Sequence, residues 1–267
     1  MTQSNSVSEQ QQAIREEYRI QAPSWGDYDV DDDLRWVVEQ IPLLPSHSVL
    51  DVAAGTGLFG RALAHAVSSI TAVDITPEMI EQGRKRAAKD GIRNMRWELG
   101  SAEALPFTDE SFDLVMSRYA IHHFADPHAV LREMCRVCKT GGLVVNVDMV
   151  SDENSAVAAH QNAVERMIDS THTMMLSPSQ LARSTTQAGL TMRSYLSREV
   201  RVKFDEWQPH VSQQSEAYRS SRRALEAELS GGRKTGMQPF VEGGELYFIH
   251  VWGVMIARKN ERESAIE

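Results

Sequence analysis

The chain has 267 residues, of which 42% are hydrophobic and 24% are charged, and its formal net charge is -9 at pH 7. This length suits one α/β domain with an elaboration, and the acidic balance argues against a nucleic-acid partner, which would require a dominant basic surface. We therefore expect a small-molecule substrate. No run reaches the ~20 apolar residues of a membrane span, and the polar first residues do not have the pattern of a signal peptide, so we also expect a cytoplasmic protein.

The first segment is expected to be only partly ordered. Residues 1 to about 12 are polar and rich in Gln and Ser, which predicts a frayed end. A helix begins after them and stops before Pro23, and an aromatic loop with Trp25 follows. The acidic start and the helical spacing of apolar residues in 31–41 predict a second helix, which Pro42 ends.

From residue 48 onward, apolar runs typical of strands alternate with helical patterns. The helix over 76–91 has the clearest signals, with Thr76 at the N-cap, Pro77 at the first helical position and Gly91 just past the end. This alternation predicts βαβ units and a parallel sheet covered by helices on both faces. The predicted strands are 48–54, 69–75, 95–100, 112–119 and 141–150, and the other predicted helices are 57–67 and 126–139.

The pattern loosens after residue 152. Helices are predicted over 154–170 and 177–189, and long strands over 190–202 and 245–259. The stretch from 203 to 236 does not fit the alternation and reads as a helical or loop insertion. We therefore divide the chain into an N-terminal helix and lid segment (1–29), a cofactor-binding domain (30–150), and a part that supplies cap helices and the final strands (151–267).

A glycine-rich turn follows the first predicted strand. In "DVAAGTGLFG", Gly55, Gly57 and Gly60 spell G-x-G-x-x-G between a strand and a helix, the context in which this motif binds a nucleoside cofactor. Asp74 ends the next strand, where a carboxylate accepts hydrogen bonds from ribose hydroxyls. Both NAD and S-adenosylmethionine (SAM) are bound in this way, so the glycines alone do not discriminate.

Asp51 favours SAM. A carboxylate at this strand end suits the ammonium group of SAM and repels the pyrophosphate of NAD. An NAD-dependent oxidoreductase remains an alternative, because the glycine motif permits it. A second alternative is a methyltransferase-like protein that binds SAM without transferring its methyl group.

Four segments of the sequence, 49–57, 72–80, 100–124 and 131–148, resemble the class I SAM-dependent methyltransferases. The likeness is strongest to the small-molecule subgroup, methyltransferase type 11, which includes ubiquinone/menaquinone C-methyltransferases. The resemblance implies an α/β, Rossmann-like, doubly wound fold. Its mostly parallel sheet has seven strands, and residues 245–259 supply the antiparallel last strand.

The resemblance also implies the cofactor site, which would hold SAM and its product S-adenosylhomocysteine (SAH). Asp74 would hold the ribose, and Glu103 would substitute at the adenine for an aspartate that many relatives carry at Ser101. The implied residues are Tyr18 and Trp25 over the methionine end, Asp51, Ala53, Gly55 and Gly57 along the methionine, Asp74, Ile75 and Met79 at the ribose and adenine, and Ser101, Ala102, Glu103, Ser117 and Arg118 at the ends of the next strands.

Methyl transfer to a phenol or an acidic carbon requires a base near the methyl group. His122 and His123 follow the fourth strand, at the sheet edge where such folds bind ligands. We favour His123 as the base, although either histidine can instead cap a loop or contact the cofactor. Cys135 and Cys138 lie in a predicted apolar helix face without a second pair, so we expect core residues and no metal site. O-, N- and C-methylation, and a monomer or a homodimer, stay open.

Overall fold

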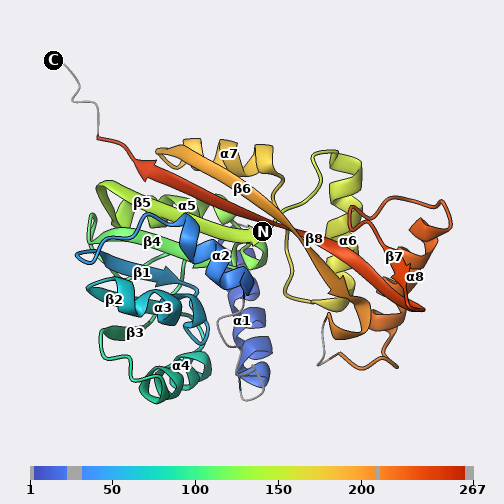
Figure 1. Ribbon diagram of the computed structural model, residues 1–267, viewed down its shortest axis with the longest axis horizontal. Coiled ribbons are helices and arrows are strands. Elements are labelled where there is room, and N and C mark those ends of the chain that lie inside the picture. The colour runs from blue at the N-terminus through green and yellow to red at the C-terminus, as the bar shows by residue number, and fades with distance from the viewer. Residues whose placement is uncertain (1–2, 23–31, 208–210, 262–267) are drawn as a thin grey trace.

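A computed structural model describes residues 3–22, 32–207 and 211–261. Its strands form one sheet in the order β3-β2-β1-β4-β5-β8-β6, and β7 pairs with β8 outside this path (Figure 1). The strands are β1 Ser48–Val52, β2 Ser69–Asp74, β3 Met95–Leu99, β4 Phe112–Arg118, β5 Cys138–Met149, β6 Leu190–Lys203, β7 Phe240–Glu242 and β8 Glu245–Lys259.

The first five strands are parallel, and β8 runs antiparallel to β5 and β6. This confirms the doubly wound α/β fold with seven main strands and an antiparallel last strand, to which the short β7 is added. The strand order reverses at β1, which lies between β2 and β4. Ligands of such sheets bind in the crevice at the carboxyl ends of the strands that flank this reversal.

Helices cover both faces of the sheet. Leu34 of α2 and Phe59 of α3 belong to the hydrophobic core on one face, and Leu131 of α5 and Leu181 of α7 belong to the core on the other. None of the helices in the described ranges is long and apolar enough to cross a membrane. The helices that pack around the sheet are α2 Asp32–Gln40, α3 Leu58–Leu63, α4 Pro77–Lys89, α5 Pro127–Val137 and α7 Pro178–Gln187.

The predicted helix over 126–139 ends two residues early. Helix α5 stops at Val137, because Cys138 adopts extended backbone and pairs with Phe112 of β4. Cys138 therefore begins a strand and does not lie in the helix with Cys135. Both cysteines are buried free thiols. The predicted helix over 57–67 is likewise shorter, since α3 passes into a 3-10 turn at Ala64–Ala66.

The expectation of a frayed N-terminus is wrong from Gln3 onward. Helix α1 spans Gln3–Gln21, and its polar side chains reach the body of the protein. The Gln10 amide donates hydrogen bonds to the carbonyl oxygens of His123, at 2.8 Å, and Thr171, at 2.7 Å. These tertiary hydrogen bonds hold a segment whose composition alone favours disorder.

A small second lobe extends beyond the sheet. Strands β6 and β8 continue past the end of β5, where Met149 pairs with Trp252, and they carry α6 (Ser155–Ile168), α8 (Glu216–Leu229) and β7 (Figure 1). The predicted insertion over 203–236 supplies α8 of this lobe. Its core consists of Val164, Phe204, Tyr218, Leu225, Met237, Leu246 and Phe248.

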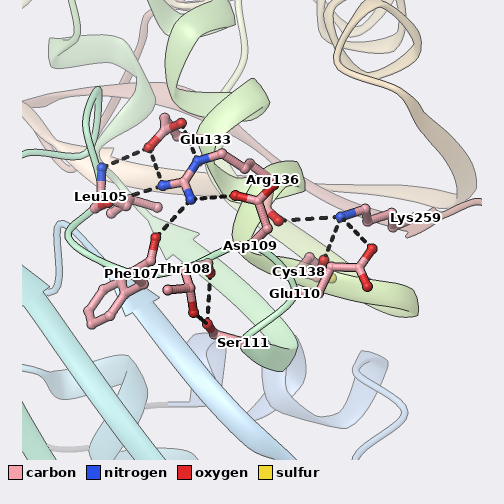
Figure 2. Close-up of polar contacts among 10 residues, drawn as sticks. All are labelled: Leu105, Phe107, Thr108, Asp109, Glu110, Ser111, Glu133, Arg136, Cys138 and Lys259. Carbon is pink, nitrogen blue, oxygen red and sulfur yellow. Dashed lines mark hydrogen bonds and ion pairs between the residues drawn. The ribbon is translucent and has the colours of Figure 1, made fainter.

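Side chains of α5 hold the loop between β3 and β4 in place by hydrogen bonds and ion pairs (Figure 2). The Arg136 guanidinium donates to the carbonyl oxygens of Leu105, at 3.0 Å, and Phe107, at 2.7 Å. It also pairs with Asp109, at 2.9 Å, and Glu133, at 2.7 Å. Glu133 in turn accepts the backbone N–H of Leu105 at 2.8 Å. This network anchors the loop that begins with the predicted adenine contacts.

Candidate active site

A cavity of about 740 Å³ opens at the carboxyl ends of β1, β2 and β4 and continues toward the second lobe. Its volume lies within the range of cofactor and ligand sites. It brings together most of the predicted site residues. Those that line it are Tyr18, Asp51, Ala53, Gly55, Asp74, Ile75, Met79, Ala102, Glu103, Arg118, His122 and His123.

The other predicted residues lie elsewhere. A Cβ on Gly57 would lie 2.5 Å from the Trp97 ring, so this glycine allows close packing. The Ser117 hydroxyl is buried and donates to the Val52 carbonyl oxygen at 3.0 Å. The Ser101 hydroxyl donates to the carboxylate of Glu103 at 2.7 Å, and only Glu103 of this pair lines the cavity. Trp25 lies outside the described residues.

The glycine-rich turn forms a cradle at the end of β1. Gly55 has a positive φ of 55°, and a Cβ placed on it would meet no protein atom within 4 Å. Its N–H donates to Asp74 at 2.7 Å. Ala53 also has a positive φ, of 53°, which is unusual for alanine and typical of strained functional sites. The open space at Gly55 is therefore available to a ligand.

The third glycine of the G-x-G-x-x-G motif, Gly60, has a structural role that accounts for the match to the NAD-binding spacing. Its N–H donates to the Asp51 carboxylate at 2.9 Å, and a Cβ on Gly60 would lie 3.0 Å from the same oxygen. This glycine allows α3 to approach β1 closely. The third glycine of the fingerprint thus has a packing role.

Asp51, Asp74 and Arg118 line the half of the cavity at the carboxyl ends of β1, β2 and β4, which we call the cofactor half. Burial raises the pKa of Asp51 to about 7, although the Gly60 N–H and the Arg118 charge oppose this. Burial also raises the pKa of Asp74, against hydrogen bonds from the backbone N–H groups of Thr76 and Gly55. Arg118 lies 4.3 Å from the centre of the Tyr119 ring. A carboxylate and a cation on one side of the cavity suit a ligand with an amino-acid end.

Helix α1 lies over the cavity. The Gln11 amide donates to Ser101 and to Glu103, each at 3.0 Å. The Tyr18 hydroxyl lies 2.8 Å from Nε2 of His123. Because these contacts join α1 to the ends of β3 and β4, the helix encloses any ligand that occupies the cofactor half.

His122 is paired with a carboxylate that the sequence analysis did not identify. Nδ1 of His122 lies 2.5 Å from Oδ1 of Asp148, near the end of β5, and no hydrogen bond joins Nε2 to any described residue. Burial lowers the pKa of His122, but the Asp148 carboxylate, helped by the charges of Asp169 and Glu165, more than offsets this, so the pKa lies above its usual 6.5. The pair has the arrangement of a histidine base oriented by an acidic partner.

His123 occupies a different environment. The Thr171 hydroxyl donates to Asp169 at 2.7 Å, so it accepts Nδ1–H of His123, 3.0 Å away. Nε2 of His123 must then accept the Tyr18 hydroxyl. Burial, followed by the adjacent His122, lowers the pKa of His123 to about 4. Both nitrogens of a neutral imidazole are therefore already used within the protein.

The second half of the cavity lies beside the second lobe. Residues two apart on a strand share a face. One face of β8 passes from Val254 in the sheet core, along Trp252 and His250 at the cavity, to Phe248 in the core of the lobe. The cavity thus lies between the two cores.

Sequence reasoning missed most of this second half. Weak signals exist, because Glu165 lies among the apolar residues of α6 and His250 interrupts the apolar run of β8. Their partners are distant in sequence, so no spacing rule joins them. The missed residues that line this half are Glu165, Asp169, His172, His250 and Trp252.

The side chains that line the cavity match the groups of SAM. Gly55 leaves the open cradle, Asp74 presents a carboxylate at the end of β2, and Met79 supplies an apolar surface for a base. Asp51 and Arg118 provide opposite charges for a zwitterion. Within the described ranges, no three His, Cys, Asp or Glu side chains are arranged to hold a metal ion. The donor set fits SAM.

Comparisons with known proteins agree with this geometry. Residues 50–146 match the family model of a methyltransferase domain. The chain is 32% identical over 176 residues to the uncharacterized methyltransferase YcgJ of Bacillus subtilis, over 66% of this chain and 70% of that protein. The crystal structure of YcgJ aligns with a TM-score of 0.77 and 26% identity, over 85% of this chain and 98% of that one. The ubiquinone/menaquinone biosynthesis C-methyltransferase UbiE of Legionella pneumophila (strain Corby) is 35% identical over 112 residues, 40% of this chain and 45% of that protein.

Proposed function

Because the chain belongs to the SAM-dependent methyltransferases, we propose that it methylates an ionisable hydroxyl group of a small, flat acceptor, with His122 as the base. The observation that carries the proposal is the His122–Asp148 pair at a cavity that also contains the cofactor cradle. The membership removes the ground for an NAD-dependent oxidoreductase.

The strand ends hold the cofactor in this proposal. SAM, when bound, supplies an electrophilic methyl group on a sulfonium that is already a good leaving group. Asp51 binds the ammonium group and Arg118 the carboxylate of its amino-acid end. Asp74 binds the ribose hydroxyls. The adenine lies in a pocket of Ile75, Met79, Ala102 and Glu103.

His122 removes the proton of the acceptor. Asp148 accepts Nδ1–H, so the lone pair of the neutral imidazole is on Nε2, which has no hydrogen bond to the described residues. That nitrogen takes the proton of the hydroxyl, and Asp148 stabilises the imidazolium that forms. Positioning and exclusion of water in the cavity beneath α1 then supply much of the rate.

The sequence favoured His123 as the base, whereas we assign this role to His122. The nitrogens of His123 are engaged by Tyr18 and Thr171, and its pKa of about 4 makes it a weak base. His123 instead connects α1 to the loop that follows α6. This role explains why a neutral histidine is buried beside the cavity.

The test is a screen with methyl-labelled SAM. Phenols, catechols, amines and thiols are offered, and labelled product is measured by mass spectrometry. We expect transfer to the phenolic and catecholic oxygen. Transfer to amines or thiols alone would contradict the choice of acceptor, and SAM that binds without being consumed would contradict methyl transfer altogether.

A further inference from the structure

A buried glutamate–histidine pair lies at the cavity on the side of the second lobe. Glu165 of α6 and His250 of β8 are 2% and 5% exposed, and Oε1 of Glu165 lies 2.9 Å from Nε2 of His250. Both side chains line the cavity. The proposed methyl transfer uses neither of them.

This pair retains unused hydrogen-bonding capacity. Neither the second oxygen of Glu165 nor Nδ1 of His250 has a hydrogen bond to a described residue. Neither atom is fully buried and both residues line the cavity, so both atoms keep access to it. A buried carboxylate that a single imidazole satisfies is costly unless a further donor completes it. The free oxygen of Glu165 is therefore suited to a donor on a ligand.

Aromatic rings surround the same space. The Trp207 ring lies 5.9 Å from the His250 ring at 75°, and the Trp252 ring lies 4.9 Å from that of Tyr119. Both tryptophans line the cavity. Such walls suit the flat, apolar body of an aromatic ligand.

The charges on this side are negative. Glu165 and Asp169 line it, whereas the Arg and Lys side chains among the described lining residues are Arg86 and Arg118. Arg86 donates to Thr56 of the glycine-rich turn, and Arg118 lies at the end of β4, so both belong to the cofactor half. A carboxylate or phosphate on the acceptor would be repelled at Glu165, while a hydroxyl or an ammonium group would be bound.

We propose that Glu165 and His250 form an acceptor-binding subsite. It selects an aromatic acceptor with a hydrogen-bond donor, a hydroxyl or a protonated amine, at the end opposite the methylated group. His250 orients the carboxylate and Glu165 contacts the donor. The inference rests on the proposed function, whose acceptor it specifies.

Three phenols with matched tails test it by binding. Tyramine carries an ammonium group, 4-ethylphenol carries none, and 3-(4-hydroxyphenyl)propanoate carries a carboxylate. Their dissociation constants are measured by calorimetry on protein saturated with SAH. We expect tyramine to bind about 10- to 100-fold more tightly than 4-ethylphenol, as for a charge-assisted hydrogen bond, and the propanoate to bind most weakly.

Variants assign the preference to the subsite. Glu165→Gln should lose most of the tyramine advantage and leave 4-ethylphenol affinity within about two-fold, while Glu199→Gln, on the exposed part of β6, should change neither. Unchanged SAH affinity shows that a variant is folded. Should Glu165→Gln fail to fold, His250→Asn decides, because loss of the orienting imidazole should reduce the tyramine advantage by several-fold.

Equal affinity of the wild type for the three tails would overturn the subsite, as would the absence of binding by all three at millimolar concentration. A tyramine preference that survives both Glu165→Gln and His250→Asn would also overturn it. These measurements need no turnover. Binding selectivity without methylation would therefore contradict the proposed function and leave the subsite supported.

Discussion

Nδ1 of His122 lies 2.5 Å from Oδ1 of Asp148, although the two residues come from a 3-10 turn after β4 and from the end of β5. The backbone N–H of Met149 donates to the same Asp148 oxygen at 2.7 Å, which fixes the carboxylate. Parallel pairing of β4 with β5 brings the two ends together. The proposed base is thus built from adjacent strand ends of the sheet.

We expect this pair to determine the pH dependence of turnover. Burial lowers the pKa of His122, but the charge and hydrogen bond of Asp148, together with the charges of Asp169 and Glu165, raise it above 6.5, and only the neutral imidazole accepts a proton. We expect kcat to rise with pH and to level off above that pKa. Asp148→Asn should lower the plateau and move the rise to lower pH, because burial then acts without the opposing charge. Profiles from pH 5 to 9 test this, and identical profiles for the two proteins would remove Asp148 from the base.

Asp51 should make cofactor binding release a proton. Its pKa of about 7 in the free protein falls when an ammonium group lies beside the carboxylate. Affinity for SAH should therefore increase as pH rises toward 7. Calorimetry at pH 6 in buffers of different ionisation enthalpy should detect the released proton. Asp51→Asn should weaken binding and abolish the release; release that persists in this variant would assign it to another group.

Gly55→Val should abolish SAH binding, because the side chain would fill the open cradle. Gly91→Val is a matched control, since Gly91 also has a positive φ, of 70°, and open space around its Cβ, but lies past the end of α4. Both variants should lose stability from the strained backbone. Calorimetry should show binding only by the control. Normal affinity in Gly55→Val would contradict the cradle.

Asp74→Ala should weaken SAH binding by about 1.5–3 kcal/mol, the usual effect of losing charge-assisted hydrogen bonds. The carboxylate also accepts the N–H groups of Gly55 and Thr76, so some of this loss comes from a looser turn. Comparing SAH with its 2'-deoxy analogue separates the two contributions. The variant should discriminate between these ligands less than the wild type does, and equal discrimination would place the ribose elsewhere.

The parts of the fold that the sequence predicted are those with local signals. Strand and helix periodicity identified β1 to β5, and the caps of α4 identified its ends. The sequence predicted the second half of helix α1 and its end before Pro23, but not its first half. That half was missed because Gln10 and Gln11 are polar, and their hydrogen bonds to His123, Thr171, Ser101 and Glu103 join distant segments.

The candidate site likewise has one half that local sequence signals predict and one half that they do not. The cofactor half follows from one short motif and the residues after each strand, as at Asp51, Asp74 and Arg118. The acceptor half depends on pairs such as Glu165 with His250, 85 positions apart, which only the folded chain brings together. Asp148 lies in a predicted strand that reads as a run of apolar core residues, and its partner is found only when β4 pairs with β5.

The most direct test of the account is single-turnover methyl transfer by the wild type and by His122→Asn, with His65→Asn, on the surface, as the control. With a phenol from the screen, the wild type and the control should form equal amounts of labelled methyl ether and SAH. His122→Asn should bind SAH with unchanged affinity but react about 100- to 10,000-fold more slowly, as expected for the loss of a general base. An undiminished rate in His122→Asn would contradict the assignment of the base.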